Sequence, residues 1–432
     1  MSNPETPKQR FWEKINSGVV IILIVGLLSG IVLLQKTRFF GLLAIINSAV
    51  KEVESTNISS GATVSNDNTA SGGQYVELIP LAVSPTPTRV PTAVPTAGPT
   101  TTPAPTITPG PSPTHAPIPP GFVGRSGSKL VQGGQTFRFS GANVSWLAMR
   151  VGDNGWTTPA EIDNVLLTVT EMGGRVVRSH TMGISVGCGR CVKPSKTTIN
   201  NDAFKSIDYA IKRAGELGIY LIIPFSDEAG GGGYYSGGNR VFSSWEGGAN
   251  FYTSPTVKAT FKEYISLMVN HVNQYTNVPN RINPTILAWE TGNEMRTAPC
   301  EWTREISAYI KSIDPNHLVL DGNDFFKDSP VNCSDLNYLD IATVDIFQTH
   351  HYGGNYGNIS PHVGLAASHN KAFIEGEHGL VDSSSIAAIQ GLYSLAETNT
   401  NFAGTLFWQL FGHADHHGYL QTSDALLGLS PP

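Results

Sequence analysis

Two carboxylates stand out because each closes an apolar run and has a hydrogen-bonding residue beside it. Glu294 ends the segment that begins at Ile286, and Glu377 ends the segment that begins at Phe373. Two carboxyl groups facing each other across a cleft can cleave a glycosidic bond, because one protonates the leaving oxygen while the other attacks or stabilises the anomeric carbon. Such chemistry needs a scaffold that brings the two segments to opposite sides of one opening.

The segment pattern beyond residue 121 predicts that scaffold. Short runs rich in β-branched residues alternate with amphipathic stretches, and eight predicted strands alternating with helices are typical of an α/β fold, the (β/α)₈ TIM barrel. The polar ends of strands four and seven then face each other across the mouth. An open doubly wound sheet is the runner-up, disfavoured because no Gly-rich phosphate turn follows the first strand. The predicted strands are Phe137–Trp146, Gly174–His180, Tyr220–Phe225, Ile286–Trp289, Leu318–Leu320, Ile346–Tyr352, Ala372–Glu377 and Gly404–Leu410.

Helices and a capping element complete the expected barrel. Apolar residues at helical spacing predict helices over Glu161–Met172, Phe204–Leu217 and Val257–Tyr275. A leading β-hairpin, Phe122–Val131 with Phe137–Phe139, is expected to cover the bottom of the barrel.

The first 120 of the 432 residues have a different character. Residues 17–34 carry no charge and would form a helix of about 27 Å, long enough for a membrane anchor, with a cleaved signal sequence as the alternative. Residues 1–50 are therefore predicted to be a cytoplasmic tail and anchor, and 51–120 a disordered linker that becomes Pro/Thr-rich from 84 onward. The formal net charge of −6 excludes a general nucleic-acid binder.

Several motifs, taken together and in this order along the chain, resemble glycoside hydrolase family 5. The opening 141–147 segment, the capping hairpin and the 283–290 segment are most similar to the endo-β-1,4-mannanase branch, over about residues 122–420. The motifs are Arg178 after Val176-Val177, Trp289 with Asn293-Glu294, His350-His351-Tyr352, Gly376-Glu377-His378-Gly379 and Gly404-Thr405-Leu406-Phe407-Trp408.

The resemblance implies a role for each matching residue. Glu294 would be the acid/base, sitting where its protonated form is favoured, and Glu377 the nucleophile. Asn293 would hold the sugar 2-hydroxyl, Arg178 would keep Glu377 ionised, and Tyr352 would hydrogen-bond it. The other predicted substrate-binding residues are His350, which would support the acid/base, Trp408, which would form the floor under the sugar, and Trp146, Trp245 and His413.

Other residues compete with these assignments, and the sequence departs from the family pattern at two positions. Glu290 and Glu375 are rival carboxylates, and Glu375 is interpreted as structural because it shares the strand face of Glu377 but sits deeper. Trp156, Tyr234 and Tyr235 lie in Gly-rich loops where aromatic rings could stack on sugars. After strand three, Phe225-Ser226-Asp227-Glu228 stands where the family usually has an Asn-Trp or His signature, and Gly292 replaces a bulkier residue.

No metal and no cofactor are predicted. The cluster 413–417, with three histidines, lacks the spacing of a zinc site and is interpreted as a substrate loop. The loops after strands four and five are neighbours in a barrel, so we expect disulfides between Cys300 and Cys333 and between Cys188 and Cys191 rather than a four-cysteine zinc site.

The sequence thus predicts a monomeric, retaining, extracytoplasmic glycoside hydrolase of polysaccharides, with an endo-β-1,4-mannanase as the first interpretation. An endo-β-1,4-glucanase and an exo-acting β-mannosidase or β-glucosidase remain alternatives. A non-catalytic carbohydrate-binding protein of the cell surface is the alternative from another class.

Overall fold

A computed structural model describes residues 118–150, 155–228, 238–324, 333–352, 356, 359–379 and 385–410, together with two strands nearer the N-terminus. Those two, β1 (Ala62–Asn66) and β2 (Gln74–Leu78), pair antiparallel inside the segment predicted to be disordered, a hairpin that the polar composition there did not indicate. The predicted membrane span 17–34 lies outside the described residues. No helix among the residues that the structure describes has the length and apolar character to cross a membrane.

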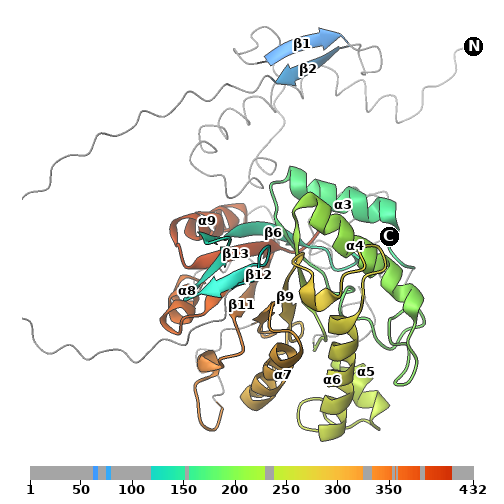
Figure 1. Ribbon diagram of the computed structural model, residues 1–432. Helices are drawn as coiled ribbons and strands as arrows, with labels where there is room; N and C mark the ends of the chain where they lie inside the picture. The colour runs from blue at the N-terminus through green and yellow to red at the C-terminus, as the bar shows by residue number, and fades with distance from the viewer. Residues whose placement is uncertain are drawn as a thin grey trace, which may run out of the picture. The chain divides into compact units, whose positions relative to one another are not determined.

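Eight parallel strands close into a barrel, as predicted (Figure 1). Around the barrel they follow the order of the chain, so each strand pairs with its sequence neighbours and the last strand pairs with the first. The strands are β6 (Phe139–Asn143), β7 (Val176–Arg178), β8 (Tyr220–Pro224), β9 (Ile286–Glu290), β10 (Leu318–Leu320), β11 (Ile346–His351), β12 (Ala372–His378) and β13 (Phe402–Phe407).

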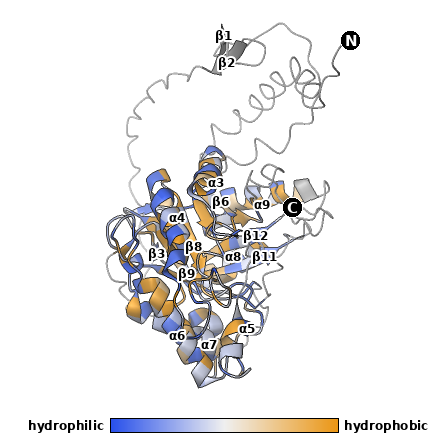
Figure 2. Ribbon diagram, turned by 90° about the vertical axis from the view of Figure 1, so that its right-hand side faces the viewer, coloured by the Kyte–Doolittle hydropathy of each residue, from blue (hydrophilic) through white to orange (hydrophobic). Residues whose placement is uncertain are grey.

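Helices surround the strands, and their apolar stripes form the outer core. In α3, Ile162, Val165, Leu166 and Val169 are buried, which is the spacing of one helix face. Figure 2 shows hydrophobic colour on the strands and mixed bands on the helices. The helices are α3 (Pro159–Glu171), α4 (Phe204–Leu217), α5 (Asn239–Trp245), α6 (Pro255–Asn270), α7 (Cys300–Ile313), α8 (Ile359–Ser368) and α9 (Ser385–Thr398).

Local signals explain where these helices begin and end. Thr158 and Glu161 form a reciprocal capping box at the start of α3, where Pro159 occupies the first turn. Gly218 ends α4 in the left-handed conformation, at φ 69°. The helix predicted over Phe204–Leu217 has those bounds.

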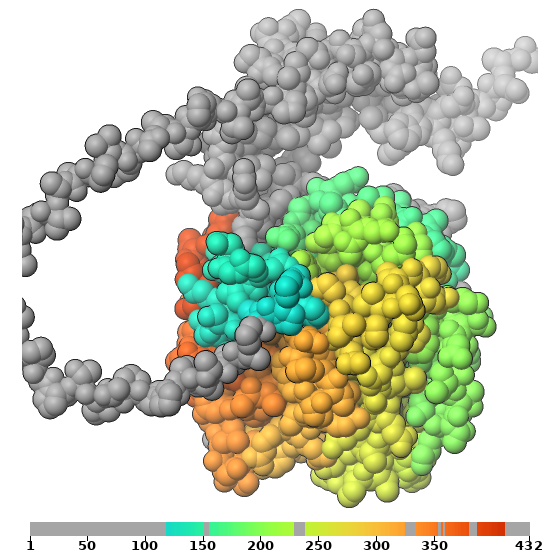
Figure 3. Space-filling model, in the orientation of Figure 1, coloured from blue at the N-terminus to red at the C-terminus, as the bar shows by residue number. Residues whose placement is uncertain are grey.

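A capping sheet is present as predicted, but its strands differ from the predicted hairpin. The segment Phe122–Val131 contains two strands instead of one, and the third strand lies just before the predicted Phe137–Phe139, of which Phe139 belongs to the barrel strand β6. The strands β3 (Gly124–Ser126), β4 (Lys129–Gln132) and β5 (Gln135–Thr136) form an antiparallel sheet. Leu130 and Phe137 are buried in one cluster with Val176, Leu318 and Ala372, the first residues of three barrel strands. The sheet therefore closes the N-terminal end of the barrel, and its cyan residues lie beside the yellow and orange segments in Figure 3. The capping sheet does not cover the opposite end of the barrel, where the carboxyl ends of the strands lie.

Candidate active site

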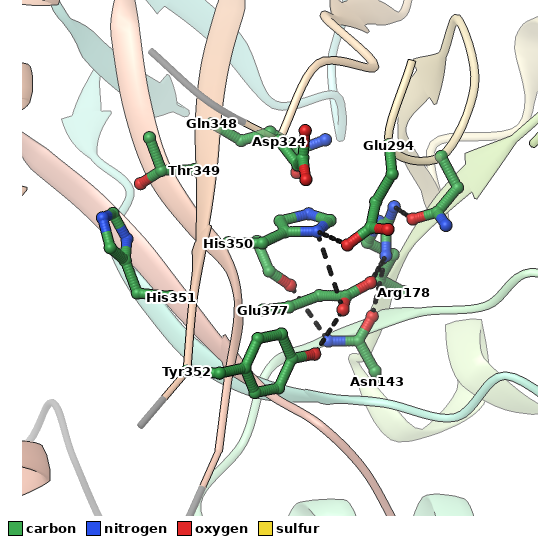
Figure 4. A network of polar contacts seen from close by, with 12 residues as sticks. Asn143, Arg178, Glu294, Asp324, Gln348, Thr349, His350, His351, Tyr352 and Glu377 are labelled. Atoms are coloured by element: carbon green, nitrogen blue, oxygen red, sulfur yellow. Dashed lines mark hydrogen bonds and ion pairs between the residues drawn. The ribbon is translucent and has the colours of Figure 1, made fainter. Parts of the chain in front are cut away.

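The two predicted catalytic carboxylates converge at the C-terminal end of the barrel (Figure 4). Glu294 follows β9, and Glu377 lies near the end of β12. Both carboxylates lie close to Nδ1 of His350, a residue of β11. The distance from this nitrogen is 3.2 Å to Oε1 of Glu294 and 3.6 Å to Oε2 of Glu377. One imidazole thus bridges the two acids, which is more than the predicted support of Glu294 alone.

Arg178 is the central cation of the site, and it is completely buried. Its Nη1 donates to Oε1 of Glu377 at 2.7 Å, as the sequence interpretation required. Its Nε and Nη2 donate to both oxygens of Glu290, at 2.7 and 2.8 Å. It also donates to the side-chain oxygens of Asn143 and Asn293, at 3.1 and 2.6 Å. The rival carboxylate Glu290 is therefore the buried counter-ion of this guanidinium rather than a reacting group.

Tyr352 and Asn143 complete the support of Glu377. The Tyr352 hydroxyl donates to Oε2 of Glu377, as predicted. Asn143 donates through Nδ2 to the carbonyl of Gly376 at 3.0 Å, which ties the first barrel strand to the residue before Glu377.

A β-bulge in β12 aims Glu377 into the barrel. The register with β11 runs from Thr349 opposite Glu375 to His350 opposite Glu377, so Gly376 is the extra residue. A Cβ on Gly376 would lie 2.1 Å from Oε1 of Gln348, so any larger residue would force the buried Gln348 side chain to move.

The bulge corrects the prediction that Glu375 shares the strand face of Glu377. Glu375 instead accepts hydrogen bonds from Thr349 and His351 at 2.6 and 3.1 Å. These two side chains lie on the opposite side of β11 from His350 (Figure 4). Its interpretation as a structural residue stands.

The pKa directions of the dyad are the reverse of those expected. Burial raises the pKa of Glu377, outweighing the nearby cations His350 and Arg178, so Arg178 orients this carboxylate without lowering its pKa overall. Burial also acts to raise the pKa of Glu294, but the hydrogen bond and charge of His350, followed by Arg296 and Arg178, bring it below its usual value. The pKa of His350 is raised despite burial because both carboxylates face it.

Arg296 and Asp324 flank Glu294 and were not predicted. Arg296 donates to Oε2 of Glu294 at 3.0 Å and to Oδ2 of Asp324 at 2.7 Å. Glu294, Asp324 and His350 are also the one group of possible metal ligands within the described part of the chain. The Arg296 guanidinium already contacts both carboxylates of that group, so it supplies the positive charge there.

The residues predicted to contact sugar differ in where the structure places them. Trp408, half-buried after β13, meets the ring of His180 edge-on at 5.1 Å beside Glu377, which suits a platform next to the dyad. Trp146 is buried in the core and donates to the carbonyl of Leu410, which corrects its prediction as a sugar contact. His413, Tyr234 and Tyr235 lie outside the described residues.

Two further tryptophans pack on the protein itself. Trp245 lies edge-on to Phe242, with the Lys193 ammonium 5.8 Å from its ring centroid, so the prediction of a sugar contact is not supported there. Trp156 packs against the core and donates to the carbonyl of Arg190.

Both predicted disulfides are confirmed, between Cys188 and Cys191 and between Cys300 and Cys333. The second ties the start of α7 to the segment after β10, the neighbouring loops of the prediction.

Comparisons with known proteins agree with this geometry. Residues 121–388 match the family model described as GH family 5 beta-mannosidase-like. The chain is 34% identical over 230 residues to mannan endo-1,4-beta-mannosidase 3 of Arabidopsis thaliana, covering 50% of this chain and 55% of that protein. It is 27% identical over 335 residues to mannan endo-1,4-beta-mannosidase F of Aspergillus fumigatus, covering 68% and 72%. The chain spans little more than half the length of the first plant relatives that it matches.

Solved structures show the same likeness. An endo-1,4-beta-mannanase from Rhizomucor miehei is 25% identical with a TM-score of 0.59, covering 72% of this chain and 97% of that one. The endo-beta-1,4-mannanase from Thermotoga petrophila is 29% identical with a TM-score of 0.56, covering 66% and 72%. The family model matches more than half of this chain. The chain therefore belongs to glycoside hydrolase family 5, with a domain of the beta-mannosidase-like type.

Proposed function

We propose that this protein is a retaining endo-β-1,4-mannanase acting on mannan or glucomannan. The observation that carries the proposal is the shared contact of Glu294 and Glu377 with one nitrogen of His350. A shared contact of this kind favours the separation of about 5–5.5 Å found in retaining glycosidases over the about 6.5–9.5 Å of inverting ones. The names of the relatives support the choice of substrate.

The proposed reaction has two displacements. Glu377, oriented through both oxygens by Arg178 and Tyr352, attacks the anomeric carbon and forms an ester. The bond from that carbon to the leaving oxygen breaks, and Glu294 gives this oxygen its proton. A water then loses a proton to Glu294 and cleaves the ester, which restores the protonated Glu294 and the Glu377 carboxylate.

The first step requires a protonated Glu294 beside an ionised Glu377. Since the free site favours the opposite arrangement, the dyad as a coupled unit, rather than either residue, sets the pH dependence of activity. His350 contacts both acids through one nitrogen, at 3.2 and 3.6 Å, and so couples their titration.

Two active-site variants test the assignment. Glu377→Ala should abolish turnover, because no ester can form. Glu294→Ala should slow substrates with poor leaving groups far more than activated aryl glycosides, which need little protonation. NMR of the first product should show the β-anomer. Full activity of either variant, or an α-anomer as the first product, would overturn the proposal.

Substrate choice is tested separately with the full chain. Reducing sugar released from mannan, glucomannan, carboxymethyl-cellulose and xylan should be greatest on the first two. Preference for carboxymethyl-cellulose would identify the endo-glucanase alternative, and release of single sugars only would identify an exo-acting enzyme. Binding of mannan without any release would identify a non-catalytic carbohydrate-binding protein.

We further propose that the enzyme acts outside the cytoplasm, anchored through residues 17–34 by way of the Pro/Thr-rich segment. Two disulfides support an oxidising compartment. Cell fractionation should find the protein in the membrane fraction, facing outward. Mature protein found only in the medium, beginning near residue 50, would refute the anchor.

A further inference from the structure

The side chain of Asn293 is held from both ends by charged groups. Its Oδ1 accepts a hydrogen bond from Nη2 of Arg178 at 2.6 Å. Its Nδ2 donates to Oδ1 of Asp227 at 2.8 Å. A cation therefore faces the amide oxygen and an anion faces the amide nitrogen, and the opposite orientation of the amide would place like partial charges together at both ends.

Asp227 reaches Asn293 because the segments after β8 and β9 continue to pair beyond the barrel strands. Asn293 donates its backbone N–H to the carbonyl of Ser226 at 2.7 Å, and Glu228 donates to the carbonyl of Asn293 at 3.1 Å. The side chains of this bridge are shielded from water, with Asp227 2% and Asn293 5% exposed. Asp227 also lies in the segment where this sequence departs from the usual family signature.

The orientation decides what Asn293 can offer a sugar. Its oxygen is committed to the guanidinium, and one of its two N–H groups is committed to Asp227. The second N–H is then the group that can meet a ligand, so Asn293 presents a donor. A sugar hydroxyl bound there must accept from Asn293, which leaves its own proton free to be donated toward Glu377.

We propose that Asp227 is a positioning residue that fixes Asn293 as a hydrogen-bond donor to the 2-hydroxyl of the sugar undergoing cleavage. Asp227 thereby contributes to selectivity at the carbon next to the anomeric centre. This inference rests on the proposed function, in which Asn293 contacts that hydroxyl. It adds a residue that acts through Asn293 and does not itself touch the sugar.

The test compares substrates with and without that hydroxyl. An aryl β-mannobioside is hydrolysed beside the analogue whose aryl-bearing sugar lacks the 2-hydroxyl, with full-length wild type and variants. Asp227→Ala should lower kcat/KM on the mannobioside by about 10- to 100-fold, the usual cost of losing a charged hydrogen-bond partner. On the 2-deoxy analogue its kcat/KM should stay within about threefold of wild type, since no hydroxyl is present for Asn293 to orient toward.

Two further variants separate positioning from folding. Asp227→Asn keeps an oxygen that can accept from Nδ2, and should recover most of the activity lost in the alanine variant. Asp314→Ala is the matched control. Asp314 is equally buried and accepts from Trp289 and His317 at 2.7 and 2.6 Å, close to where α7 ends rather than at the catalytic end. That variant should lower thermal stability and affect both substrates by the same factor.

Each outcome decides the proposal. An equal loss on both substrates in the Asp227 variants would show a merely structural role, and no loss in Asp227→Ala would show that Asn293 needs no such partner. Because 2-deoxymannose and 2-deoxyglucose are one sugar, the comparison can be repeated with an aryl β-cellobioside if wild type prefers glucans. In that case the mannanase proposal fails while the role of Asp227 is still decided.

Discussion

Replacing Gly376 by alanine should damage both stability and catalysis through a single methyl group. The added Cβ would lie 2.1 Å from Oε1 of Gln348 and 2.9 Å from Nε2 of His350, far inside ordinary contact distance. Gln348 is 1% exposed, so its amide cannot move into solvent. It must instead give up its hydrogen bonds to Oε1 of Glu290 at 2.7 Å and to the carbonyl of Asp321 at 3.0 Å.

The size of the effect follows from those two bonds. One acceptor is charged and one is neutral, so their loss costs about 2–4 kcal/mol of unfolding free energy. For a domain of this size that corresponds to a fall in melting temperature of roughly 5–10 °C. Catalysis should fall at least about tenfold, because Glu290 holds Arg178, Arg178 holds Glu377, and small misplacement of a nucleophile is costly.

Gly391 provides the matched control, since it lies inside α9 and a Cβ there meets nothing within 4 Å. Gly391→Ala should raise the unfolding free energy by about 0.5–1 kcal/mol and leave kcat/KM unchanged. Calorimetry and initial rates on mannan measure both variants. If Gly376→Ala melted and reacted like Gly391→Ala, the bulge would not require glycine and the reasoning would be wrong.

Two other perturbations have calculable directions. Removing the charge of Arg296 in Arg296→Gln should raise the pKa of Glu294, which then stays protonated to higher pH, so the alkaline limb of the kcat/KM profile should move upward. Arg296 is half-exposed, so solvent screens its charge and the movement should be small; an unmoved or lowered limb would contradict the reasoning. Breaking Cys300–Cys333, whose residues are 33 apart, should cost roughly 3–4 kcal/mol of unfolding free energy, against about 2 kcal/mol for Cys188–Cys191, 3 apart. Denaturant titration of the two double-alanine variants measures the difference, and the reverse order would refute the loop-length argument.

The barrel was predictable because each strand is a short apolar run bounded by turn residues. Leu318–Leu320 and Phe204–Leu217 were placed to the residue. The sequence also predicted the positions of Glu294, Glu377 and Arg178. In a (β/α)₈ barrel the carboxyl ends of all strands lie at the same end, and this does not depend on how the core packs.

What escaped prediction depends on geometry that strand alternation does not encode. Alternation placed Glu375 and Glu377 on one face, and only the register shift at Gly376 separates them. The glycine between two acids was the available signal for that bulge. Glu290 was named as a rival carboxylate and Asp324 was not predicted, because a buried counter-ion and a catalytic acid look alike in sequence until their partners are known. Trp146, the last residue of the predicted strand Phe137–Trp146, was predicted to contact sugar, although the chain turns its ring into the core.

The engagement of Arg178 has a consequence for how the enzyme comes to be folded. Its guanidinium bonds to side chains on or after β6, β9 and β12, segments that are far apart along the chain. Without β12 in place, Arg178 could still pair with Glu290, but its contact with Glu377 would be absent. Burial of these charged groups is therefore coupled to closure of the barrel. In an incomplete barrel, water would reach the charged groups and Glu377 would lack its partner Arg178. A chain truncated before β12 cannot close the barrel. It should therefore lose both its activity and its cooperative unfolding transition, rather than retain a reduced activity and a reduced stability.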